Sequence, residues 1–110
     1  MSQVAYPNEI DLLSVLGVDP ERSDDIYSYI VTDAADITLR FSFNPTDDTI
    51  QTWLGRGSTP IAIISHEKLT RMWIDEGVLR AECQYGTGCV QLALSVYPII
   101  RVEWSGLRTS

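Results

Sequence analysis

The sequence lacks any long hydrophobic run, and no stretch approaches the roughly 20 apolar residues that a membrane-spanning helix requires. The N-terminal residues 1–9 have neither a basic start nor an apolar region, so we expect no secretory signal and a cytoplasmic protein. Internal repeats and low-complexity segments are also missing. At 110 residues the chain is expected to form a single domain, 1–110, with one hydrophobic core.

Histidine and cysteine are scarce, which limits the chemistry that the chain can perform. His66 is the only histidine, and its neighbours Ser65 and Glu67 would point away from it in a strand, so the three cannot form a catalytic triad. Cys83 and Cys89 flank a turn, and in a reducing compartment we expect thiols there rather than a disulfide or a metal site. We therefore predict no enzyme activity, no cofactor and no metal site.

Basic residues are scarce in the first half of the chain. Residues 1–48 contain ten acidic and two basic residues, a balance of −8, whereas residues 49–110 have a balance of +1. The acids do not follow the ligand spacing of a calcium loop, and residues 55–59 lack the lysine of a phosphate loop. An acidic surface repels nucleic acid and anionic membranes and attracts basic proteins. Acidity that only keeps the protein soluble is the alternative.

Alternating apolar and polar residues dominate the stretch from Leu79 to Trp104. Such alternation predicts strands with one buried face, because successive side chains point to opposite sides of a sheet. The Gly86-Thr87-Gly88 segment between two alternating runs predicts a hairpin turn. Pro98 interrupts the pattern, which indicates a sheet edge, a bulge or a change of sheet.

The rest of the chain predicts one helix and further strands. Asn8 and Gly17 suit the two caps of a short helix, whose apolar stripe must dock on the sheet. The runs 26–32, 37–43, 50–54, 61–64 and 69–74 predict strands, with 61–64 as a central strand and 55–60 as a flexible loop. We expect an α+β, mainly β domain: an antiparallel sheet or sandwich of about six to eight strands with one short N-terminal helix.

Acidic and aromatic residues occur close together in two places: Asp24 and Asp25 precede Tyr27 and Tyr29, and Asp47 and Asp48 precede Trp53. In a meander the turns at 24–25 and 47–48 would lie at the same end of the sheet, with Trp53 near enough to reach them. Aromatic side chains supply contact area at interfaces, and acids steer a basic partner. Trp53, Trp73 and Trp104 as core residues are the alternative. The predicted partner-binding residues are Asp24, Asp25, Tyr27, Tyr29, Asp47, Asp48 and Trp53.

In composition and strand pattern the chain resembles the immunity proteins of bacterial toxin–immunity systems, including contact-dependent growth inhibition. The resemblance rests on a short, acidic, β-rich chain without catalytic residues. It implies a protein that binds one cognate toxin domain, often a basic nuclease, and blocks its active site. A small acidic adaptor or accessory domain that binds another protein is the second interpretation, and a small enzyme is the third.

Overall fold

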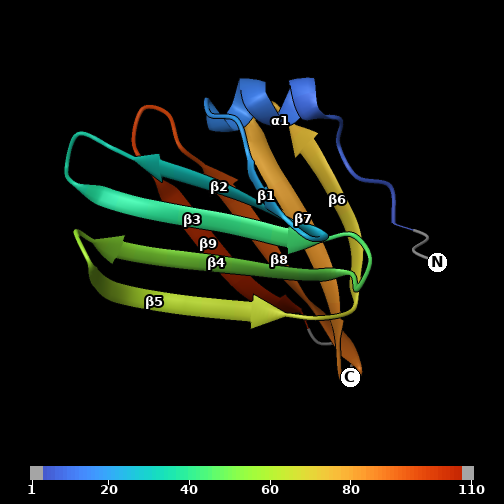
Figure 1. Ribbon diagram of the computed structural model, residues 1–110. Coiled ribbons are helices and arrows are strands. Elements are labelled where there is room, and N and C mark those ends of the chain that lie inside the picture. The colour runs from blue at the N-terminus through green and yellow to red at the C-terminus, as the bar shows by residue number, and fades with distance from the viewer. Residues whose placement is uncertain (1–3, 108–110) are drawn as a thin grey trace.

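The computed structural model describes residues 4–107, which form two antiparallel β-sheets facing each other and one short helix (Figure 1). The five-stranded sheet has the order β1-β2-β3-β4-β5, and the four-stranded sheet has the order β6-β7-β8-β9. The elements are α1 (Glu9–Leu16), β1 (Glu21–Ser23), β2 (Ile26–Thr32), β3 (Ile37–Asn44), β4 (Thr49–Arg56), β5 (Thr59–His66), β6 (Leu69–Asp75), β7 (Val78–Tyr85), β8 (Gly88–Ser95) and β9 (Arg101–Leu107). The predicted mainly β fold is confirmed, with nine strands instead of six to eight.

Each sheet is a meander in which every strand pairs with its neighbour in sequence. Alternation sets the inner face: in β3, Leu39, Phe41 and Phe43 are buried, whereas Arg40 between them is exposed. In β7 and β8, Leu79 pairs with Leu94 and Ala81 with Leu92, so the predicted hairpin also buries one continuous apolar row. The hydrophobic core therefore lies between the two sheets.

Helix α1 covers the sandwich on the side of β6 and β7 (Figure 1). The side chain of Asn8 accepts a hydrogen bond from the Asp11 amide, and Gly17 ends the helix at φ 75°. Leu12 and Leu16 are buried, whereas Ile10 and Leu13 on the other side are exposed. A helix of eight residues is too short to persist alone, so this docking stabilises it.

One hydrogen bond joins the two sheets through the core. The indole N–H of Trp104 in β9 donates to the hydroxyl of Thr52 in β4 at 2.9 Å. Thr52 is the buried polar residue of the described core, with 2% of its surface exposed, so the bond satisfies a hydroxyl that water does not reach. Trp104 is thus a core-packing residue, as the alternative interpretation of the tryptophans expected.

Two predictions about the middle of the chain are wrong. The run 61–64 is part of an edge strand, β5, and not of a central strand, because the chain leaves for the other sheet after His66. The segment 55–60 is no flexible loop: β4 continues to Arg56, β5 starts at Thr59, and Gly57 at φ 59° makes a tight turn between them. The short strand β1 consists of exposed polar residues, a composition that by itself would indicate a turn.

Candidate partner-binding surface

The acidic turns β1–β2 and β3–β4 lie at the same end of the five-stranded sheet, as the strand count predicts. Tyr27 at the start of β2 pairs with Phe43 near the end of β3, which places the turns before and after them side by side. The exposed carboxylates of Asp24, Asp25 and Asp47 gather there. We call these three residues and Asp48 the acidic end. Like charges so close together repel one another, and a cationic partner would relieve that repulsion.

Two aspartates of the acidic end, Asp24 and Asp48, are also required by the local structure of their turns. Asp24 and Asp48 both have a φ of 54°, and aspartate tolerates the left-handed conformation better than most residues. The Asp48 carboxylate also accepts a hydrogen bond from the Tyr6 hydroxyl at 2.8 Å, and its carbonyl accepts one from the Leu69 amide at 2.9 Å. Asp48 therefore fixes the N-terminal segment and the start of β6 against the turn. Asp25 and Asp47 are exposed, and the Asp47 carboxylate accepts a hydrogen bond from the Asn44 side-chain amide at 3.3 Å within the turn.

The structure places the two predicted tyrosines differently. Tyr29 is 1% exposed and packs in the core, so its side chain is not accessible to a partner in this conformation. Tyr27 is half-buried and stacks on Phe43, with the Arg22 guanidinium 5.0 Å from its ring centre. Only Tyr27 of the two tyrosines reaches the surface.

Trp53 lies on the outer face of the five-stranded sheet, between Arg40 and Ile63 on the neighbouring strands. Its ring extends over Gly55, because a Cβ atom at that glycine would come within 2.8 Å of Trp53 Cζ3. Gly55 lies toward the C-terminal end of β4, whereas the acidic end is at the N-terminal end. Trp53 therefore does not reach Asp47 and Asp48, and the expected contact is wrong.

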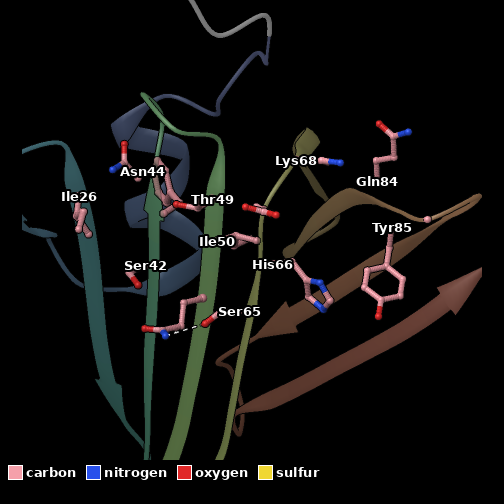
Figure 2. Close-up of a pocket in the computed structure, with 14 residues that line it drawn as sticks. Ile26, Ser42, Asn44, Thr49, Ile50, Ser65, His66, Lys68, Gln84 and Tyr85 are labelled. Carbon is pink, nitrogen blue, oxygen red and sulfur yellow. Dashed lines mark hydrogen bonds between the residues drawn. The ribbon is translucent and has the colours of Figure 1, made fainter.

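A concavity of about 910 Å³ lies next to the acidic end, between the outer face of the five-stranded sheet and the β7–β8 hairpin (Figure 2). Its floor is polar: Gln51 donates a hydrogen bond to Ser65 at 2.8 Å, and Ser42 lies on the next strand. Its wall is formed by His66 and by Tyr85, which is 65% exposed. Such a floor suits polar side chains of a partner better than an apolar ligand.

Aromatic contacts hold the wall of the concavity. The His66 ring meets Tyr85 edge-on at 5.9 Å and lies 5.0 Å from the Trp104 ring. The Gln84 amide donates to the Lys68 carbonyl at 3.0 Å, which fixes the hairpin against the link between β5 and β6. This concavity could not be predicted from the sequence, because it forms only where the β7–β8 hairpin of one sheet comes to lie beside strands β2 to β5 of the other.

The two cysteines are free thiols in the structure. Cys83 pairs with Val90 and Cys89 with Gln84, so the thiols occupy adjacent rungs and point to opposite faces of the sheet. Burial, with a smaller contribution from Glu82, raises the pKa of Cys83 to about 11, which keeps its thiol protonated and unreactive at neutral pH.

Within residues 4–107, no group of three or more His, Cys, Asp or Glu residues is arranged to hold a metal ion. Over the same range, none of the helical structure is long and apolar enough to cross a membrane.

The fold is similar to that of a chain in a solved structure, a contact-dependent growth inhibition toxin–immunity protein complex from Klebsiella pneumoniae 342. The TM-score is 0.85 at 20% sequence identity, and the match covers 97% of this chain and 100% of that chain. Neither a protein-family model nor a curated protein matches the sequence. The resemblance inferred from composition and strand pattern is thus confirmed at the level of the fold.

Proposed function

We propose that this chain is a cytoplasmic immunity protein that binds a cognate toxin domain and neutralises it by blocking its active site. The observation that carries the proposal is the whole-chain similarity of the fold to a component of a toxin–immunity complex. The separately derived acidic end supports it, because a surface of like charge beside a concavity with a polar floor would suit a basic protein surface.

We further propose that the toxin domain is basic and that it is a nuclease. Nucleases that act on RNA or DNA need a positively charged cleft to hold phosphates. The carboxylates of Asp25 and Asp47 would occupy that cleft in place of phosphates, and the concavity would receive the side chains at its rim. Tyr27 would contribute contact area, whereas Tyr29 and Asp48 would act through packing and the hydrogen bond to Tyr6.

A growth experiment tests the function. The toxin domain to use is the one encoded by the gene directly upstream, since an immunity gene is expected to follow its toxin gene. Its expression alone should stop growth, and co-expression of this chain should restore growth and allow both proteins to be purified together. Growth arrest caused by this chain alone would identify it as the toxic component and would contradict the proposal.

Binding kinetics test the basic character of the partner. Exposed charges are screened over about 8–10 Å at physiological salt. The association rate with the toxin domain should therefore fall as the ionic strength rises. A rate that does not change with salt would contradict steering by the acidic end, even if the two proteins bind.

A further inference from the structure

A second hollow, of about 330 Å³, lies beside the acidic end, between the N-terminal segment 6–8, the start of α1 and the start of β2. We call it the aromatic pocket, because four rings line it: Tyr6, Tyr27, Tyr29 and Phe43. Pro45 of the β3–β4 turn is also part of the lining. Ligand pockets in proteins start at about 300 Å³, so this volume suits one inserted side chain.

The rings of the aromatic pocket are stacked nearly in parallel around Phe43. The centre of the Phe43 ring lies 5.3 Å from that of Tyr6 and 5.4 Å from that of Tyr27, with interplanar angles of 13° and 11°. The face of an aromatic ring is partly negative and attracts a cation. The Arg22 guanidinium lies 5.0 Å from the centre of the Tyr27 ring, so this group of rings already holds one guanidinium.

The Tyr29 hydroxyl is a buried polar group without a hydrogen-bond partner among residues 4–107. The large majority of buried side-chain polar atoms are paired, so this hydroxyl calls for an explanation. Burial raises the pKa of Tyr29, and the Glu9 carboxylate, which also lines the pocket, raises it further. The hydroxyl therefore lies near Glu9, on the side of the pocket formed by the start of α1. A polar group that enters the pocket beside Glu9 would supply the missing partner.

The charge around the aromatic pocket is negative. Glu9 is exposed at its rim, and within residues 4–107 its carboxylate forms no ion pair. The Tyr6 hydroxyl donates to the Asp48 carboxylate at 2.8 Å, which brings the acidic end next to the pocket. The partial positive charge at the start of α1 is offset by Glu9 and Asp11 in its first turn. A cation is therefore attracted to this pocket, and an anion is repelled.

We propose that the aromatic pocket receives an arginine side chain of the toxin domain. This inference rests on the proposed function and names a contact that anchors the two proteins. The guanidinium lies against the aromatic faces and donates hydrogen bonds to the Glu9 carboxylate and the Tyr29 hydroxyl, while its apolar stem packs on Leu12. Arginine fits better than lysine, because its planar group stacks on rings and is more weakly hydrated.

Tyr29 links the stability of the free chain to its affinity for the partner. Its side chain is 1% exposed in this conformation, so the hydroxyl is reached only when a neighbouring ring turns aside. Tyr6 and Tyr27 are half-buried, and rotamer changes of such side chains are common at protein interfaces. The unpaired hydroxyl destabilises the free chain and is satisfied in the complex. The two effects have separate readouts.

n-Butylguanidinium, a mimic of the arginine side chain, tests the pocket in the chain alone. In an NMR titration at constant ionic strength it should shift the amide signals of Glu9, Leu12 and Tyr27, with a Kd of about 10 mM. n-Butylurea has the same shape without the charge and should bind at least about fivefold more weakly. No shift of these signals up to about 50 mM would overturn the pocket, and equal binding of the two compounds would overturn the choice of a cation.

Two substitutions remove the polar groups of the pocket one at a time. Tyr29→Phe and Glu9→Gln should each weaken binding of n-butylguanidinium at least about threefold and binding of the toxin domain at least about fivefold. Asp11→Asn is the matched control, because it removes a carboxylate from the same turn of α1 but outside the pocket lining. It should change both affinities less than about twofold at physiological salt.

Thermal unfolding separates packing from binding at Tyr29. Tyr29→Phe should melt at or above the Tm of the parent chain, so its weaker binding would not come from a damaged fold. Unchanged affinity of both Tyr29→Phe and Glu9→Gln for the toxin domain would overturn this inference and leave the proposed function standing. No binding of the toxin domain by the parent chain would overturn both.

Discussion

Removing the hydrogen bond between Thr52 and Trp104 tests most directly whether this bond ties the two sheets together. Thr52→Val keeps the shape of the side chain but removes the hydroxyl that accepts the indole N–H at 2.9 Å. Thr52 is 2% exposed, so solvent does not replace the lost partner from its side. The variant leaves the Trp104 N–H unpaired in a half-buried position.

The expected loss of stability follows from two contributions, the lost hydrogen bond and the unpaired indole N–H. A typical intramolecular hydrogen bond contributes about 1 kcal/mol net, and a buried unpaired donor costs about 1–3 kcal/mol. Because water reaches part of Trp104, we expect Thr52→Val to lower the free energy of unfolding by about 1–2 kcal/mol. Trp104→Phe should cost about 2–4 kcal/mol, because it also leaves a cavity.

Urea denaturation followed by circular dichroism would measure the two variants and their combination. The pair should show a coupling energy of about 1 kcal/mol in a double-mutant cycle. Thr32→Val is the control, because Thr32 shares a 2.9 Å hydrogen bond with Thr38 on the exposed face, and it should cost less than about 0.5 kcal/mol. A coupling energy below about 0.3 kcal/mol would refute the idea that this bond ties the sheets together.

Three further predictions concern single positions. Tyr29→Phe removes a buried hydroxyl that has no hydrogen-bond partner within residues 4–107, so the midpoint of urea unfolding should rise, corresponding to about 1 kcal/mol; a fall would show that the hydroxyl is satisfied. Gly55→Ala should destabilise by about 1–3 kcal/mol, because the added methyl group meets the Trp53 ring and the Thr59 carbonyl oxygen at 2.7 Å; a Tm equal to that of the parent chain would contradict this packing. The pKa of Asp33 is lowered, chiefly by the hydrogen bond from the Ile37 amide. Its carboxylate therefore stabilises the fold at pH values above the ordinary pKa of 3.8. This contribution is lost as the pH falls through the lower pKa of the folded state. Asp33→Asn should therefore flatten the dependence of stability on pH below about pH 4, and an unchanged slope would rule out this contribution.

The sequence predicted the meander well where alternation is clean. Leu39, Phe41 and Phe43 alternate with polar residues, so both the strand and its buried face could be predicted. Strand β5 could not be placed at an edge from its apolar run, because a buried central strand and an apolar edge strand can have the same composition. Whether another strand follows in the same sheet depends on the path of the chain after His66.

The candidate surface was predicted only in part. Connectivity alone placed the acidic turns at one end, because alternate turns of a meander share an end. The sequence did not show which way the side chains point: Tyr29 faces the core, and the Trp53 ring lies toward Gly55. Nor did it show that Asp48 binds Tyr6, since that contact joins segments that only the fold brings together.

The measurement that tests the proposed function most directly is the affinity of the purified toxin domain for two charge-reversal variants, determined by titration calorimetry. The first variant reverses the exposed members of the acidic end and leaves Asp48 intact. The matched control reverses the same number of acids on the other sheet and its β6–β7 turn. The variants are Asp24→Lys/Asp25→Lys/Asp47→Lys and Glu76→Lys/Glu82→Lys/Glu103→Lys.

Both variants change the net charge equally, so a difference between them reports the location of the binding surface and not the overall charge. We predict that the first variant raises the Kd for the toxin domain at least about tenfold, while the control changes it less than about threefold. Both should retain the β-sheet circular dichroism spectrum of the parent chain. Equal affinities for the two variants, or no binding of the toxin domain by the parent chain, would contradict the proposed function at the acidic end.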